Sequence, residues 1–209
     1  MTSDFDTIAA LTARDQLGPH EAPLLRELRG GTALDLGCGL GTAARILASR
    51  FERVDAIDLS PGMIAEARRR TRARNIHYEV ADLFEWLQTH ASYDCIVSLA
   101  TLHHVDEPRA LRSMAHALRP GGQLLVVDLI ERTSLPLNAV AWIAARLREL
   151  RTGRMTRSER KAWEEHGRTE RYRTWRDVQA LAATLPGATA RQHLLWRYSL
   201  RWTKEFIPS

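Results

Sequence analysis

The first 130 residues alternate short apolar runs with segments of helical spacing, and this alternation limits the possible folds more than any other feature. The runs contain few polar positions, which is typical of parallel strands that helices cover on both faces. Strands and helices in regular alternation favour an α/β fold with a doubly wound sheet. The predicted strands span residues 32–36, 53–59, 76–82, 93–100 and 123–129.

The pattern changes after residue 130. Residues 131–187 contain two amphipathic stretches around an arginine-rich segment, and we predict a helical insertion there. Thr174 and Asp177 fit a capping box at the start of its second helix. Residues 188–209 have the pattern of two strands joined by a tight turn, a hairpin that would close the sheet. With residues 30–130 as the core, a chain of 209 residues is expected to form one domain.

Composition narrows the class of protein further. A hydrophobic content of 44% is enough for a packed core. No apolar run approaches the ~18 residues that a membrane span requires, and the N-terminus lacks a cationic start followed by an apolar stretch. The two cysteines, Cys38 and Cys95, suggest neither a zinc site nor a disulfide. We therefore expect a reduced, cytoplasmic protein without a metal or a membrane partner.

The formal net charge of +5 is unevenly distributed. Residues 1–130 carry a net charge of −3, and residues 131–209 carry a net charge of +8. A basic C-terminal third would suit nucleic acid or an anionic ligand. It would also suit solvated helix faces on which arginine is simply the solubilising cation, because charge asymmetry is a weak functional signal.

The stretch ALDLGCGLGT places three glycines in alternate positions directly behind the first predicted strand. Glycine weakens strands and helices, so Gly37, Gly39 and Gly41 indicate a turn that another group approaches closely. In α/β sheets this turn binds nucleotide-like ligands. Thr42 stands where the dinucleotide fingerprint requires its third glycine. Asp35 beside the turn would repel a pyrophosphate, whereas it would tolerate an ammonium or sulfonium group.

Two further acidic residues end the next two predicted strands. Asp58 lies where a carboxylate can accept both ribose hydroxyls, and Asp82 is placed to accept a hydrogen bond from an adenine amino group. Leu59, Met63 and Leu83 are apolar neighbours that could sandwich a purine ring. Each acid, taken alone, also fits a helix cap or a solvated loop. Together with the glycine turn, they predict one ligand at a single edge of the sheet.

These stretches resemble the motifs of the class I S-adenosylmethionine-dependent methyltransferases. ALDLGCGLGT is similar to the first motif of that family, VDAIDLSPGMI to the second and YEVADL to the third. YDCIVSLATLHHV resembles the motif on the fourth strand, and LRPGGQLLVVD resembles the turn into the fifth. The resemblance covers about residues 30–130 and implies a seven-stranded sheet whose last strand is antiparallel. It also implies S-adenosylmethionine as the cofactor and S-adenosylhomocysteine as the product.

The same resemblance implies how the cofactor lies. The glycine turn would pass under its methionine part, Asp58 would hold the ribose, and Asp82 would hold the adenine together with Leu83. Ser98 and Leu99 would lie along the cofactor near the transferring methyl group. The residues expected to contact the cofactor are Asp35, Gly37, Cys38, Gly39, Gly41, Asp58, Leu59, Met63, Asp82, Leu83, Ser98 and Leu99.

An acceptor hydroxyl must lose its proton when it is methylated, and His103 is the best-placed base for that step. It lies just past the fourth predicted strand, at the carboxyl edge of the sheet. A supporting or packing role fits His103 equally well. His104, the next residue, should point the other way, and we interpret it as structural.

The sequence carries neither an N-P-P-Y-like motif after the fourth strand nor a cysteine placed for nucleophilic chemistry. The pattern of LHHV with LRPGG therefore resembles the small-molecule branch of the family, which includes quinone and natural-product methyltransferases. We expect the helical insertion to cover the acceptor site. Trp142 and Trp163 are candidate contacts for a planar or apolar acceptor, although both would also serve to pack the insertion. The N-terminal segment, with Phe5 and His20, could form a second lid.

Three functions are compatible with the sequence. The first is methylation of a small molecule at a hydroxyl, an amine or a carbon. The second is methylation of RNA, with the arginines between Arg146 and Arg176 holding phosphates. The third is a binding protein that keeps the cofactor pocket without catalysis, or a sheet that binds a different nucleotide. The motifs favour an enzyme because none of their positions is degraded, whereas the acceptor, the pathway and the oligomeric state stay open.

Overall fold

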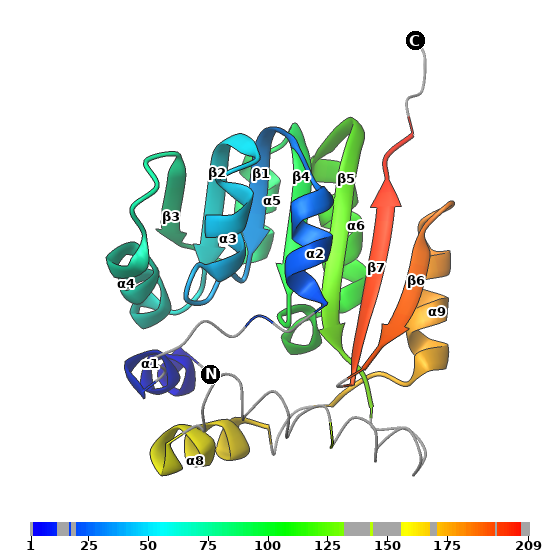
Figure 1. The fold of residues 1–209 in the computed structure, drawn as a ribbon. Coiled ribbons are helices and arrows are strands. Elements are labelled where there is room, and N and C mark those ends of the chain that lie inside the picture. Colours follow the sequence, from blue (N-terminus) through cyan, green and yellow to red (C-terminus); the bar gives the residue numbers. More distant parts are fainter. Residues whose placement is uncertain are drawn as a thin grey trace.

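Seven strands form one continuous sheet in a computed structural model of the chain (Figure 1). The structure describes residues 2–11, 17, 20–131, 143, 156–167, 171–194 and 196–205. The strand order is β3-β2-β1-β4-β5-β7-β6. The strands are β1 (Gly30–Leu36), β2 (Phe51–Asp58), β3 (Ile76–Val80), β4 (Tyr93–Leu99), β5 (Leu118–Leu129), β6 (Thr189–His193) and β7 (Arg197–Thr203).

The strands β1 to β5 pair in parallel, and β7 runs antiparallel to both β5 and β6. This pairing confirms the predicted doubly wound sheet with an antiparallel last strand. β5 begins at Leu118 rather than at residue 123, because Leu118 already pairs with Tyr93 of β4. The strand order reverses between β1 and β4, and the carboxyl ends of strands at such a reversal are the usual ligand site of an open α/β sheet.

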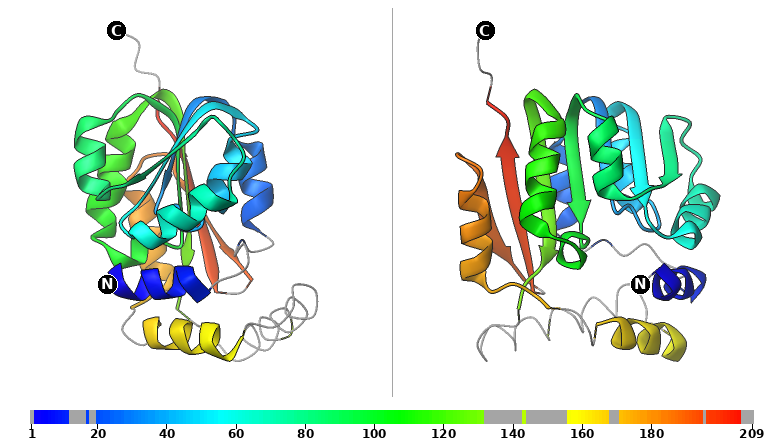
Figure 2. Two further views of the ribbon diagram at one scale, coloured as in Figure 1. Left: turned by 90° about the vertical axis from the view of Figure 1, so that its left-hand side faces the viewer. Right: turned by 180° about the vertical axis from the view of Figure 1, so that it is seen from behind.

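Helices cover both faces of the sheet (Figure 2). One face carries α5 (Leu83–Thr89), α6 (Glu107–Ala117) and α9 (Trp175–Ala183). The other face carries α2 (Glu21–Glu27), α3 (Thr42–Leu47) and α4 (Pro61–Arg70). Ile96 and Val97 of β4 are both fully buried, one in each of the two cores that result. Burial on both faces explains why the strands have almost uninterrupted apolar sequences.

Local signals in the sequence set the starts of two helices. Oγ of Ser60 accepts a hydrogen bond from the backbone N–H of Met63 at 3.1 Å, and Pro61 takes the first position of α4. Thr174 and Asp177 form the predicted capping box at the start of α9. These bonds satisfy backbone N–H groups that have no partner within the helix.

Two further helices, α1 (Thr2–Leu11) and α8 (Arg157–His166), lie side by side across the carboxyl edge of the sheet (Figures 1 and 2). α8 falls within the predicted helical insertion, where residues 132–142, 144–155 and 168–170 lie outside the described part of the chain. In the ranges that the structure covers, no helix has both the length and the apolar character needed to cross a bilayer.

Candidate active site

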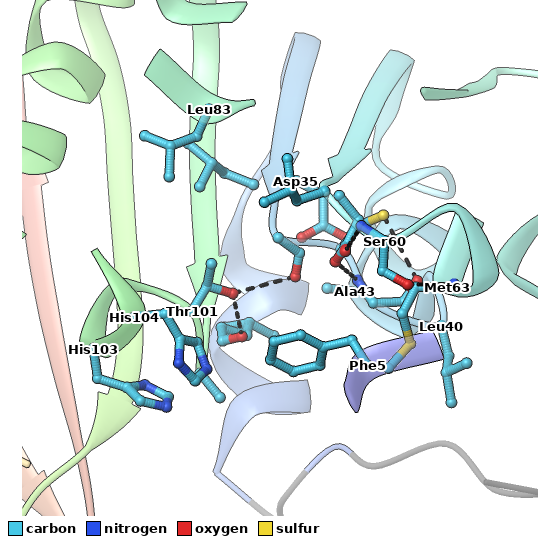
Figure 3. A pocket seen from close by; sticks show the side chains of 18 of the residues that line it. Phe5, Asp35, Leu40, Ala43, Ser60, Met63, Leu83, Thr101, His103 and His104 are labelled. Carbon is cyan, nitrogen blue, oxygen red and sulfur yellow. Dashed lines mark hydrogen bonds between the residues drawn. The ribbon is translucent and has the colours of Figure 1, made fainter. Parts of the chain in front are cut away.

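A cavity of about 430 Å³ opens at the carboxyl ends of β1, β2 and β4 (Figure 3). Its size falls in the range typical of small-molecule sites. The walls come from the glycine turn after β1, the end of β2, the loops after β3 and β4, and the helices α1 and α8. The predicted cofactor residues on these walls are Asp35, Gly37, Cys38, Gly39, Asp58, Leu59, Met63, Asp82, Leu83 and Leu99.

At two of the three glycines in the turn, neighbouring side chains leave no room for a Cβ. A Cβ on Gly37 would lie 2.2 Å from Oγ1 of Thr101, and a Cβ on Gly41 would lie 2.4 Å from the hydroxyl oxygen of Tyr78. A Cβ on Gly39 would meet no described atom within 4 Å, although its φ of +50° still favours glycine. Gly39 therefore leaves open space on the cavity wall, whereas Gly41 does not line the cavity.

The carboxylate of Asp58 joins the end of β2 to the glycine turn. Its Oδ2 accepts a hydrogen bond from the backbone N–H of Gly39, and its Oδ1 accepts one from the backbone N–H of Ser60, both at 2.9 Å. Burial raises the pKa of Asp58, and the backbone donors oppose that rise. A carboxylate oxygen can accept two hydrogen bonds. Each oxygen of Asp58 is therefore able to accept from one further donor, such as a hydroxyl of a vicinal pair.

Asp35 brings a second carboxyl group to the same wall. It is 1% exposed, and its Oδ2 has no hydrogen-bond partner among the described residues. Burial raises the pKa of Asp35 to about 7, although a hydrogen bond from the backbone of Ala44 lowers it. A cationic group in the cavity would favour the ionised form of this carboxyl group.

Asp82 caps a helix and also lines the cavity. Its Oδ1 accepts hydrogen bonds from the backbone N–H groups of Phe84, at 2.8 Å, and Glu85, at 3.1 Å, at the start of α5. The sequence presents a cap and a ligand contact as alternatives, and the position of Asp82 is compatible with both. Leu83 is buried on the same wall, whereas Leu59 is 48% exposed.

Ser98 does not line the cavity, contrary to the expectation that it lies along the cofactor. Its Cα lies opposite Leu36 of β1 and Val126 of β5, and the residue is 1% exposed. Successive side chains of a strand point to opposite faces. Leu99, the next residue along β4, reaches the cavity wall instead.

His103 lies in the short helix η1 (Leu102–His104), where Asp128 of β5 holds it. Nδ1 of His103 lies 2.6 Å from Oδ1 of Asp128, and the backbone N–H of His103 donates to Oδ2 at 3.1 Å. His103 lines the cavity, and Asp128 is 1% exposed. A carboxylate at Nδ1 favours the tautomer that carries its proton there, so the lone pair of the neutral ring lies on Nε2.

Nothing in the sequence near His103 identifies Asp128 as its partner, because the two residues lie 25 positions apart. A signal for Asp128 itself is nevertheless present. It is the acidic residue within the apolar strand sequence QLLVVDL, and a carboxylate buried in such a strand requires a polar partner.

His104 also lines the cavity, so the expectation that it points the other way is wrong. The ring centroids of His103 and His104 lie 3.9 Å apart, and Phe5 of α1 meets His104 edge-on at 5.3 Å (Figure 3). The centroid of His166 in α8 lies 5.2 Å from that of His104. Consecutive side chains of a 3₁₀-helix are about 120° apart rather than opposite each other, so both histidines can face one cavity.

The N-terminal helix forms part of the cavity wall, to which it contributes Phe5 and Ile8. Oδ1 of Asp6 accepts a hydrogen bond from Oγ of Ser60 at 2.5 Å and one from the backbone N–H of Gly62 at 2.9 Å. These two bonds attach α1 to the start of α4, whose N-cap Ser60 lies two residues beyond Asp58.

Other residues predicted for the lids do not reach the cavity or lie outside the described part of the chain. His20 does not line the cavity and stacks on His193 instead, with 5.1 Å between the ring centroids. Trp142 lies outside the described residues. Trp163 lies in α8, and its side chain falls outside what the structure describes.

Several known proteins resemble this chain in sequence or in fold. Residues 33–122 match the family of methyltransferase domains. An uncharacterized methyltransferase of Mycobacterium tuberculosis is 31% identical over 173 residues, which cover 81% of this chain and 85% of that protein. A ubiquinone biosynthesis O-methyltransferase of Xylella fastidiosa is 37% identical over 110 residues, which cover 51% of this chain and 44% of that protein. Magnesium protoporphyrin IX methyltransferase of Synechocystis, solved with bound S-adenosylhomocysteine, has the same fold, with a TM-score of 0.60. The two proteins are 15% identical, and the matched part covers 97% of this chain and 94% of that chain.

The chain therefore belongs to the class I S-adenosylmethionine-dependent methyltransferases. This membership confirms the family and the cofactor that the motifs imply.

Proposed function

We propose that the protein transfers a methyl group from S-adenosylmethionine to a small-molecule acceptor, and that His103 is the base that takes the acceptor's proton. One observation carries the proposal: His103, held by Asp128, lines the same cavity as the glycine turn and Asp58. A base and a cofactor site on one cavity would allow an acceptor to contact both at once.

The cavity wall is compatible with each part of the cofactor. Gly39 leaves space for the methionine part, and Asp58 offers carboxylate oxygens to the ribose hydroxyls. Asp82 and Leu83 are placed for the adenine. Asp35, buried and with an unpartnered oxygen among the described residues, suits the positive charge of the ligand. When bound, S-adenosylmethionine supplies the activated methyl carbon.

The chain's own residues would orient the acceptor and move one proton. Because Asp128 accepts from Nδ1 of His103, Nε2 is the atom that would take the proton from an acceptor hydroxyl. The carboxylate of Asp128 then stabilises the imidazolium that forms. Phe5 on α1 and His166 on α8 cover the cavity, and this cover would exclude water from the reacting groups.

A planar or apolar small molecule suits this enclosure better than a polymer does. The cavity of about 430 Å³ has to hold both cofactor and acceptor, and its walls include the rings of Phe5 and Tyr172. An RNA would have to bring its base past α1 and α8 to reach His103. The Xylella fastidiosa relative is named for a step of ubiquinone biosynthesis, which supports a small acceptor.

Methyl-labelled S-adenosylmethionine tests this proposal. The purified protein, incubated with it and with cell extract, should place the label in the small, organic-extractable fraction. The variant His103→Asn should label the same fraction far more slowly. Label in the RNA fraction would instead support the alternative acceptor, and no label in any fraction would favour a binding protein without catalysis.

A further inference from the structure

Next to η1, a buried carboxylate forms an ion pair with a partly exposed arginine. Glu107 is the first residue of α6, where a carboxylate is usually solvated, yet it is only 6% exposed. Its Oε2 accepts a hydrogen bond from Nε of Arg173. Burial raises the pKa of Glu107, and the hydrogen bond from Arg173 lowers it. A buried carboxylate of this kind needs its cation, because removal of Arg173 would leave the charge of Glu107 uncompensated.

The backbone of Arg173 is fixed at the end of β5. Ile130 and Arg173 form an isolated parallel bridge, and the backbone N–H of Glu131 donates to the carbonyl oxygen of Arg173 at 2.9 Å. The preceding residue, Tyr172, lines the cavity with its ring centroid 5.6 Å from that of His103. The segment that follows α8 therefore brings a tyrosine and an arginine to the region of the proposed base.

The charges of this region act on one another. Burial and Arg173 have the largest effects on the pKa of Glu107. Smaller effects come from the charge of Asp128, which raises this pKa, and from the charge of His103, which lowers it. Tyr198 of β7 pairs with Asp128 of β5. Burial is the main cause that raises the pKa of Tyr198. The charges of Asp128 and Glu107 raise this pKa further, and the charge of Arg173 lowers it. Six described titratable or charged groups contact His103 or interact with its neighbours: Asp128 from β5, His104 from η1, Glu107 from α6, Tyr172 and Arg173 from the segment after α8, and Tyr198 from β7, which pairs with Asp128. His166 of α8 and Arg197 of β7 line the same cavity.

We propose that Glu107 and Arg173 are positioning residues that together set the proton affinity of His103. Two carboxylates near an imidazole favour its protonated form, and a base that already carries a proton cannot accept another. The guanidinium of Arg173 cancels one of these two negative charges. The remaining carboxylate, Asp128, then orients the ring while His103 stays able to accept a proton near neutral pH. The catalytic role of this ion pair rests on the proposed function. The proton affinity of His103, however, can be measured without an acceptor.

Substitutions in the two halves of the ion pair should shift the pKa of His103 in opposite directions. Arg173→Gln leaves both carboxylates and should raise the pKa by about half a unit to one unit, because an unscreened negative charge favours the imidazolium. Glu107→Gln leaves the cation and should lower the pKa by a similar amount. The double variant, with both glutamines, should return close to the wild-type value. NMR titration of the imidazole in the whole protein, without cofactor or acceptor, measures each pKa.

A purely structural role predicts a different pattern. Both single variants break the same ion pair, so shifts of the same sign, or no shift in either, would overturn the proposal. Arg173→Lys keeps the charge but changes the geometry of the hydrogen bond, and it should leave the pKa of His103 close to that of the wild type. A large shift in this variant would also contradict the proposal. If opposite shifts are found in a protein that transfers no methyl group, the proposed function fails while this inference stands.

Discussion

Asp35 and Asp58 bring two carboxyl groups to one cavity wall, and the structure stabilises them differently. Each oxygen of Asp58 accepts a hydrogen bond from a backbone N–H group, which favours the ionised form. Asp35 lies deeper, with one oxygen that has no partner in the described part of the chain. Asp58 is thus suited to accept hydrogen bonds, whereas the charge of Asp35 depends on what else occupies the cavity.

The variant Asp35→Asn should change how the free energy of unfolding depends on pH. Burial raises the pKa of Asp35 to about 7 in the folded protein, whereas the unfolded chain has an ordinary value of about 4. The folded state therefore holds this proton more tightly, and that contribution to stability is full below about pH 4 and is lost as the pH rises through 7. An asparagine stays neutral and avoids this loss.

Urea unfolding at pH 5 and pH 8 measures this effect. The stability of the asparagine variant relative to the wild type should be greater at pH 8 than at pH 5. A difference that is the same at both pH values would mean that Asp35 ionises in the folded protein as it does in the unfolded chain.

At the scale of elements, α1 completes the cavity and packs against α4 and α8. Ile8 packs against Leu40 and Met63, in a cluster apart from the two cores of the sheet. Asp6 provides the polar attachment through Ser60 and Gly62. Because this cluster is separate from the two cores, α1 can move away from the cavity without opening the sheet.

Substitution of Asp6 should therefore weaken cofactor binding more than it lowers global stability. Asp6→Ala removes the acceptor of both hydrogen bonds, so α1 should leave the cavity more often and the affinity for S-adenosylhomocysteine should fall several-fold. Asp6→Asn keeps one acceptor oxygen and should show an intermediate affinity. Calorimetry of binding and thermal unfolding measure the two effects separately. Wild-type affinity in the alanine variant would show that α1 does not control access to the cofactor site.

Elements built from local signals could be predicted from the sequence. The apolar runs locate the five parallel strands, and Ser60 with Pro61 predicts the start of α4 because both act on the adjacent backbone. The wrong orientation of His104 has a local cause as well. Three residues of a 3₁₀-turn have no periodicity that distinguishes them from an extended loop, so the angle between His103 and His104 cannot be read from their spacing.

At the scale of the whole molecule, the contacts that a sequence does not predict join distant segments. Asp6 and Ser60 lie 54 positions apart, and Glu107 and Arg173 lie 66 positions apart. The family motifs give the order of elements for residues 30–130 and hence the place of the glycine turn. They give no information on α1 or on the segment after α8, because those parts lie outside the motifs. The cover of the cavity and the charges around His103 become visible only in the folded chain.

The central claim is that one cavity holds both the cofactor and a base. Asp58 would bind the cofactor, and His103 would be the base. The most direct measurement determines turnover together with the affinity for S-adenosylhomocysteine in His103→Asn and Asp58→Ala. The asparagine variant should lose about 10²–10⁴-fold in turnover and keep its affinity, whereas Asp58→Ala should lose roughly 1.5–3 kcal/mol of binding free energy. Unchanged turnover in His103→Asn would contradict the account and make His103 a packing residue.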